Sequence, residues 1–206
     1  MTTDHEGGRI VMLGRATTIF PDSLALGTAG DESFAFHQGV LEARELRRLG
    51  VDVNFAPVLD VLTERYSPNI GIRSYGKDPA VVTRNGIARI KGMQKGGLSA
   101  CAKHFPGKGH SPLDAHLRLP TIDSTWAEMR ATHLPPFLAA VEEGVDCLMT
   151  SHPIYRISTR RAFRRPSRGA SFTSTSVRRS DSRASSSRTT SRWAPSARRA
   201  RSARRW

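Results

Sequence analysis

The sequence predicts an α/β fold in which helices alternate with the strands of a parallel sheet. Three apolar runs of strand length, at 51–56, 98–103 and 145–150, are separated by stretches with helical periodicity. Each helical stretch has a capping residue at its start and a glycine at its end. Strands connected in this way pair in parallel through right-handed crossovers.

The capping signals set the expected bounds of the helices. We expect them to run from Asp31 or Ser33 to Gly50, from Asp78-Pro79 to Gly96-Gly97, and from Ser124 to Gly144. The third helix has to break or restart at Pro135-Pro136, because proline is not accommodated in a helix interior.

Polar residues follow the ends of the predicted strands. Asp60, Lys103-His104 and Ser151-His152 each come after an apolar run, and long loops are expected at 57–77 and 104–123. The carboxyl ends of parallel strands meet at one edge of a sheet, where the active sites of such folds lie. These residues are therefore candidates for a shared site.

The strong positive charge lies at one end of the chain. The total is 32 Lys+Arg against 18 Asp+Glu, a net charge of +14. Residues 1–157 hold 17 basic and 17 acidic side chains, so 158–206 carry the whole excess as 15 arginines against Asp181. This Arg/Ser-rich tail has no hydrophobic period, and we expect it to be disordered. Its composition and abrupt onset indicate an out-of-frame reading.

Cysteine usage and hydropathy suggest a cytoplasmic protein. Cys101 and Cys147 lie in apolar runs and form no CxxC pair, which is typical of buried thiols in a reducing compartment. No apolar run has membrane-spanning length, and the first residues have no secretory pattern. We expect no membrane partner and no specific nucleic-acid partner. The chain is also expected to begin inside a structural element.

The stretch KHFPGKGHSPLDAH at 103–116 carries most of the candidate chemistry. It places a lysine and a histidine at a strand end, then a glycine-hinged loop, then Asp114 and His116. An aspartate two residues from a histidine can fix its tautomer and stabilise its protonated form. That arrangement makes a tuned general acid/base.

Five motifs in order resemble those of glycoside hydrolase family 3, in its bacterial β-N-acetylhexosaminidase branch. They are DHEGGRIV at 4–11, VNFAPVLDV at 53–61, IGIRSYGKDP at 70–79, KHFPGKGHSPLDAHLRLP at 103–120 and CLMTSHPIY at 147–155. The resemblance implies a partial TIM (β/α) barrel of about four strands over 1–157, followed by the tail at 158–206.

The resemblance also implies roles for individual residues. Those expected to hydrogen-bond the hydroxyls of the non-reducing-end sugar are Asp4, Asp60, Arg73, Lys103 and His104. His116, oriented by Asp114, is the expected general acid/base. The implied activity is a glycosidase that removes terminal β-linked N-acetylglucosamine from a carbohydrate substrate with retention, using no cofactor and no metal. His110 and Lys108 depart from the family's H-G-D pattern and receive no role.

One element of the family pattern is absent. The nucleophilic aspartate, expected in an S-D-D-like strand after 147–152, has no counterpart after Ile157, and Asp181 sits in arginine-rich sequence. Without it the covalent step of a retaining mechanism does not occur. We therefore expect a truncated chain with little activity and, because four strands leave sheet edges open, poor solubility.

Three alternatives remain open. A metal-dependent barrel hydrolase would use the histidines and the aspartate of the same loops as zinc ligands: His104, His110, Asp114, His116 and His152. An RNA-binding protein would act through the arginine-rich tail, with salt-dependent affinity. Within the family, the glycosyl group can also pass to phosphate or another acceptor.

Overall fold

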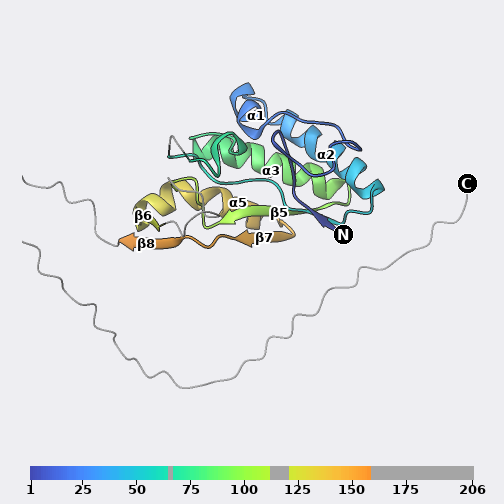
Figure 1. Ribbon diagram of the computed structural model, residues 1–206. Coiled ribbons are helices and arrows are strands. Elements are labelled where there is room, and N and C mark those ends of the chain that lie inside the picture. Colours follow the sequence, from blue (N-terminus) through green and yellow to red (C-terminus); the bar gives the residue numbers. More distant parts are fainter. Residues whose placement is uncertain (65–66, 112–120, 159–206) are drawn as a thin grey trace, which may run out of the picture. The chain divides into compact units, whose positions relative to one another are not determined.

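A computed structural model describes residues 1–64, 67–111 and 121–158 (Figure 1). Asp114 and His116 lie outside the described residues, as does the predicted tail from residue 159 onward. The description below concerns the first of two compact units, Met1–Arg164.

Four parallel strands form the central sheet. They are β1 (Thr2–Thr3), β4 (Val53–Asn54), β5 (Ser99–Phe105) and β7 (Cys147–Thr150), and they are neighbours in that order. Cys101 is the register partner of Cys147. The α/β class and the parallel sheet are thus confirmed.

The first predicted strand is shorter than its apolar run. Only Val53–Asn54 is a regular strand, whereas 51–56 was expected. The chain nevertheless continues along β5: the amide of Lys103 donates to the carbonyl of Pro57 at 3.1 Å, and the amide of Leu59 donates to the carbonyl of Lys103 at 2.6 Å. The consecutive carbonyls of Ala56 and Pro57 accept from the amides of Cys101 and Lys103, so the alternation of a regular ladder is interrupted here, as in a β-bulge. The extension ends one residue before Asp60.

Two smaller strand pairings lie outside this sheet. The strands β2 (His5–Gly7) and β3 (Ile10–Val11) are antiparallel. The strands β6 (Thr121–Thr125) and β8 (Ile154–Ser158) are parallel. Strand β6 occupies the end of the expected long loop at 104–123.

Helices α2 (Ser33–Arg48) and α3 (Pro79–Lys95) lie side by side on the same side of β5 and β7 (Figure 1). The short helix α1 (Ser23–Ala29) precedes them. The side chain of Asp78 caps α3 by accepting from the amide of Ala80 at 2.8 Å, as predicted. Asp31 accepts from the amide of Ser33 at 2.9 Å just before α2.

The third helical stretch differs from the prediction. Ser124 belongs to β6, and Thr125 is the capping residue, in a capping box with Glu128. A short α4 (Trp126–Glu128) and a π-helical turn, Met129–His133, then lead to α5 (Pro135–Glu142). The expected restart at the proline pair is confirmed, because Pro135 opens α5.

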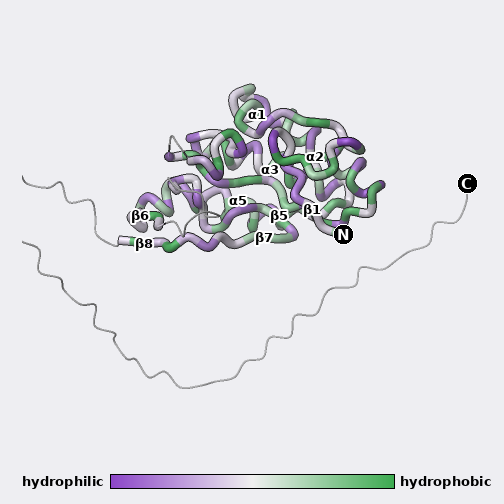
Figure 2. The backbone as a smooth tube through the Cα atoms, in the orientation of Figure 1, coloured by the Kyte–Doolittle hydropathy of each residue, from purple (hydrophilic) through white to green (hydrophobic). Residues whose placement is uncertain are grey.

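The core lies between the helices and the sheet. Hydrophilic and hydrophobic segments alternate along α2 and α3 (Figure 2), and Leu46, Ile90 and Met93 are fully buried. The two helices approach closely at glycines: a Cβ on Gly39 would lie 2.4 Å from the carbonyl oxygen of Arg89. No helix in the described ranges is both long and apolar enough to cross a membrane.

Candidate functional site

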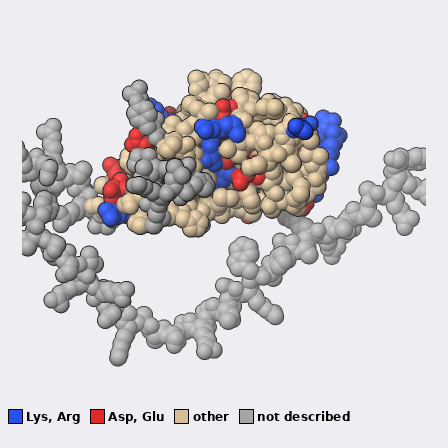
Figure 3. Space-filling view, viewed as in Figure 1, with Lys and Arg blue, Asp and Glu red and all other residues tan. Residues whose placement is uncertain are grey.

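A cavity of about 550 Å³ opens at the carboxyl ends of the parallel strands. Its polar lining includes Asp4, Glu6, Arg73, Lys103, His104 and Lys108, and it continues along 149–153, which includes Ser151 and His152. Asp4 follows β1, while Lys103 and His104 end β5. Basic and acidic side chains also adjoin one another on the face seen in Figure 3. The structure thus gathers four of the five predicted sugar-binding residues into the wall of one cavity.

Asp60, the fifth, lies directly behind His104. Its side chain is fully buried, with Oδ2 2.7 Å from Nδ1 of His104, and Oδ1 accepts from the amide of Lys108 at 2.6 Å. Burial opposes ionisation of this carboxyl, yet the charge and hydrogen bond of His104 lower its pKa. Burial also lowers the pKa of His104, although the Asp60 carboxylate acts against that.

The tautomer of His104 follows from this pairing. An ionised carboxylate only accepts hydrogen bonds, so the proton between the two groups resides on Nδ1. In neutral His104, Nε2 is then left as an acceptor.

Glu6 is the residue that sequence reasoning missed. Its side chain is 4% exposed and accepts a bidentate pair of hydrogen bonds from Arg73, at 2.8 Å from Nε and 2.7 Å from Nη2. Lys103 Nζ lies 2.6 Å from the same carboxylate and also pairs with Asp4. Burial works against the charge, but Arg73 and Lys103 lower the pKa of Glu6 to about 2. The sequence signal that could have identified Glu6 is its two-residue spacing from Asp4, because alternate residues of an extended segment point to the same side.

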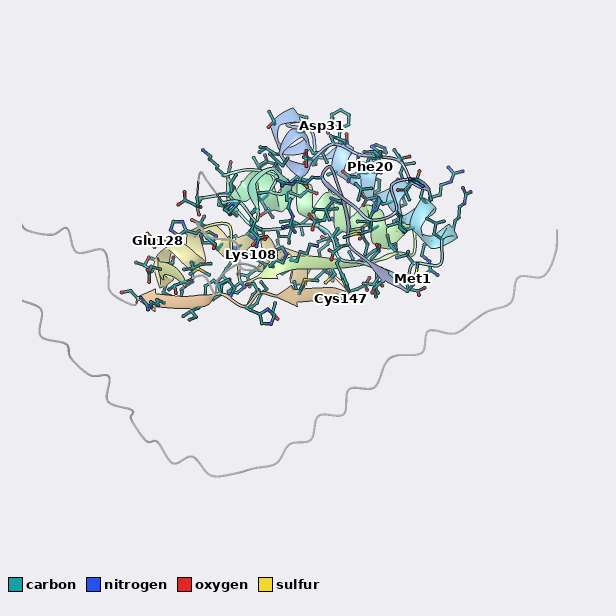
Figure 4. All side chains as sticks on the ribbon, in the orientation of Figure 1. Met1, Phe20, Asp31, Lys108, Glu128 and Cys147 are labelled. Atoms are coloured by element: carbon teal, nitrogen blue, oxygen red, sulfur yellow. The ribbon has the colours of Figure 1, made fainter. Side chains whose placement is uncertain are left out.

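The loop after β5 is tied to neighbouring segments on both sides. Figure 4 shows Lys108 beyond the carboxyl end of β5. Nδ1 of His110 lies 3.0 Å from Oγ1 of Thr63, and the hydroxyl of Tyr155 donates to the carbonyl of Gly107 at 3.3 Å. Ser151 Oγ in turn lies 2.7 Å from the Tyr155 hydroxyl. Asp114 and His116 follow this loop but lie outside the described residues.

Of the candidate metal ligands, His104 and His110 lie in the described residues and contact other side chains, while Asp114 and His116 lie outside those residues. Within 1–64, 67–111 and 121–158, no group of three or more His, Cys, Asp or Glu side chains is arranged to hold a metal ion. His104 is engaged by Asp60 and His110 by Thr63.

A known protein family matches most of the chain. The profile of the glycosyl hydrolase family 3 N-terminal domain matches residues 1–180. The chain belongs to this family. The resemblance predicted from the five motifs is confirmed.

Relatives that are named for a glycosidase activity are similar over most of the chain. It is 38% identical over 162 residues to a β-hexosaminidase of Neisseria meningitidis serogroup C, covering 75% of this chain and 45% of that protein. A family 3 β-N-acetylglucosaminidase structure from Paenibacillus sp. matches with a TM-score of 0.73 and 39% identity, over 75% of this chain and 29% of that one. The chain thus spans about half the length of the curated relatives it matches.

One solved relative carries a sugar derivative. The structure of NagZ from Neisseria gonorrhoeae in complex with N-trifluoroacetyl-D-glucosamine matches with a TM-score of 0.67 and 36% identity, over 75% of this chain and 47% of that one.

Proposed function

We propose that the cavity binds the terminal, non-reducing N-acetylglucosamine of a β-linked glycoside, as part of a retaining β-N-acetylhexosaminidase. The observation that carries this proposal is the convergence of Asp4, Arg73, Lys103 and His104 on one cavity at the strand ends. Hydrogen-bond donors and acceptors in fixed positions suit a polyhydroxylated ligand. A sugar whose hydroxyls do not match them leaves polar groups of the site unpaired, which weakens the binding of that sugar.

The protonation state of each side chain determines whether it donates or accepts hydrogen bonds. The guanidinium of Arg73 and the ammonium of Lys103 donate to hydroxyl oxygens, while the carboxylate of Asp4 and Nε2 of His104 accept hydroxyl protons. Both oxygens of Asp60 are engaged, by His104 and by the amide of Lys108. We therefore propose that Asp60 acts on the sugar through His104; direct contact with a hydroxyl stays a prediction.

We propose that His116 is the general acid/base at the glycosidic bond and that Asp114 orients it. A retaining mechanism also requires a nucleophilic carboxylate, which accepts the glycosyl group before water or another acceptor removes it. Residues 158–206 contain no stretch like the family's nucleophile strand. We propose that this sequence forms a sugar-binding half of a (β/α) barrel with little hydrolytic activity, and that 158–206 is an out-of-frame tail.

The strand order supports the barrel assignment. Sheet neighbours follow chain order, as in a singly wound (β/α) barrel. The proposed compartment is the reducing cytoplasm, on the basis of the free thiols Cys101 and Cys147.

The test is calorimetric binding of N-acetylglucosamine to the full chain. We expect saturable binding that is lost in the K103M variant and retained in K91M, since Lys91 is exposed on α3 and pairs with Glu143. Glucose, which lacks the acetamide, should bind at least about tenfold more weakly. Folded protein that binds neither sugar would overturn the proposal.

A kinetic assay tests the second part of the proposal. We expect release of p-nitrophenol from its N-acetyl-β-glucosaminide to be no faster than in a buffer blank, with or without added phosphate. Turnover well above the blank would show that the chain contains a working nucleophile. A dependence of that turnover on phosphate would indicate phosphorolysis.

A further inference from the structure

Arg89 is a fully buried charged residue on α3, next to the proposed sugar site but outside its lining. Its guanidinium is held by Glu42 of α2, with Nε 3.1 Å from Oε2 and Nη2 2.6 Å from Oε1. Both side chains have zero exposure, and Gln38 donates to the same Glu42 carboxylate at 2.7 Å. The guanidinium is therefore fixed in position between the two helices.

The same guanidinium reaches strand β2. Nη2 of Arg89 donates to the carbonyl of Glu6 at 2.7 Å and lies 3.4 Å from the carbonyl of His5. Asn54 adds a second attachment, donating to the His5 carbonyl at 2.8 Å and accepting from the His5 amide at 3.0 Å. Strand β2 is not a member of the four-stranded sheet. Side chains from α3 and β4 therefore attach β2 to the rest of the fold, in addition to its pairing with β3.

Glu6 links this attachment to the cavity. Its carbonyl receives the hydrogen bond from Arg89, and its carboxylate receives those from Arg73 and Lys103. A shift of the Glu6 backbone would therefore displace the carboxylate that orients two of the proposed sugar-binding cations.

A buried ion pair needs a reason, because desolvating two charges costs free energy that a well-packed apolar pair does not. The Arg89–Glu42 pair supplies directed hydrogen bonds to carbonyl groups, which no apolar side chain offers. The close crossing of α2 over α3 at Gly39 holds the backbone of Arg89 itself in place.

We propose that Arg89 is a positioning residue of the sugar site: locked by Glu42, its guanidinium sets the position of β2 and thereby holds the Glu6 carboxylate against Arg73 and Lys103. The effect on sugar affinity rests on the proposed function. The effect on Glu6 does not.

The experiment follows the carboxyl carbon of Glu6 by NMR between pH 7 and pH 3.5, with the signal assigned from the E6Q variant. In the wild type the signal should stay that of an ionised carboxylate throughout, because the pKa of Glu6 is about 2. In R89K and in E42Q we expect titration to appear within this range, as the pKa moves toward its ordinary value of 4.5. In both variants the affinity for N-acetylglucosamine should fall about tenfold, equivalent to about 1.4 kcal/mol.

Two controls separate positioning from general destabilisation. L46A removes buried core atoms and should lower the melting temperature without titration of Glu6. R84M changes an exposed arginine on the same helix and should alter neither readout.

The outcomes are distinct. An unchanged Glu6 signal in folded R89K and E42Q overturns the positioning role, and so does titration of Glu6 in L46A. Wild-type protein that binds no sugar overturns the proposed function alone, since the Glu6 titration still decides the role of Arg89.

Discussion

Nδ1 of His104 lies 2.7 Å from Oδ2 of Asp60, and this contact determines which ring nitrogen is available to a ligand. The carboxylate is fully buried and its second oxygen accepts the amide of Lys108, so one side chain fixes both the imidazole and the start of the following loop. His104 is therefore a preorganised acceptor rather than a freely rotating ring.

Replacing the carboxylate by an amide tests this directly. In D60N we expect the pKa of His104 to fall further, because the carboxylate is what raises it against burial. Sugar affinity should drop about tenfold as the tautomer is no longer fixed. Histidine ¹⁵N shifts and calorimetry measure the two effects. D52N, at an exposed carboxylate that pairs with Met1 and Arg47, should leave both unchanged.

Stability should decline as the pH falls below 6.5. Burial lowers the pKa of His5, His104 and His133 from that ordinary value, so protons bind the unfolded chain first. Their contribution is fully present above pH 6.5 and is lost progressively below it. Urea unfolding at pH 7.5, 6.5 and 5.5 measures the slope, which H133F should reduce and H37Q, at an exposed histidine, should not. Equal stability at the three pH values would contradict the assignment.

Glu6 should make stability depend on pH in a second, more acidic range. Its pKa is about 2 in the folded protein against 4.5 ordinarily, so its contribution is complete above pH 4.5 and disappears between 4.5 and about 2. The shift corresponds to on the order of 3 kcal/mol. We expect E6Q to be destabilised by about that amount in urea unfolding at pH 7. The matched exposed change, E143Q, should cost no more than about 1 kcal/mol; equal losses would argue against a special role for Glu6.

The two thiols should react at different rates. Cys101 is buried, and burial raises its pKa to about 11, whereas Cys147 is partly exposed. A chromogenic disulfide reagent at pH 8 should label Cys147 quickly and Cys101 only after unfolding. The C147S variant should lose the fast phase. Two equivalents reacting at one rate in native protein would contradict the burial of Cys101.

Local signals sufficed for α2, α3 and the presence of strands β5 and β7. They overestimated β4, which covers Val53–Asn54 rather than 51–56, and they predicted no strand at Thr2–Thr3. The cap at Asp78, the proline after it and the apolar spacing of Ile90 and Met93 all lie within one helix, so the sequence displays them directly. The third helix start was misplaced by one residue because Ser124 and Thr125 are both good caps. Only the position of Glu128, three residues after Thr125, distinguishes them.

The site was predictable as far as its motifs reached. Asp4, Lys103 and His104 line one cavity because strand ends converge in this fold, and Arg73 joins them from the short 3₁₀ turn Gly71–Arg73. Glu6 and Arg89 could not be assigned in this way, since their partners are distant in sequence: Glu6 meets Arg73, and Arg89 meets Glu42. An arginine inside a helix reads as solvent-facing until its buried partner is known.

Because β1, β4, β5 and β7 lie in the sheet in the same order as in the chain, they can assemble in the order in which a ribosome makes them. Each strand meets an edge that is already exposed, and no strand has to be threaded between two that have already paired. The four-stranded sheet can therefore grow from β1 onward while synthesis continues.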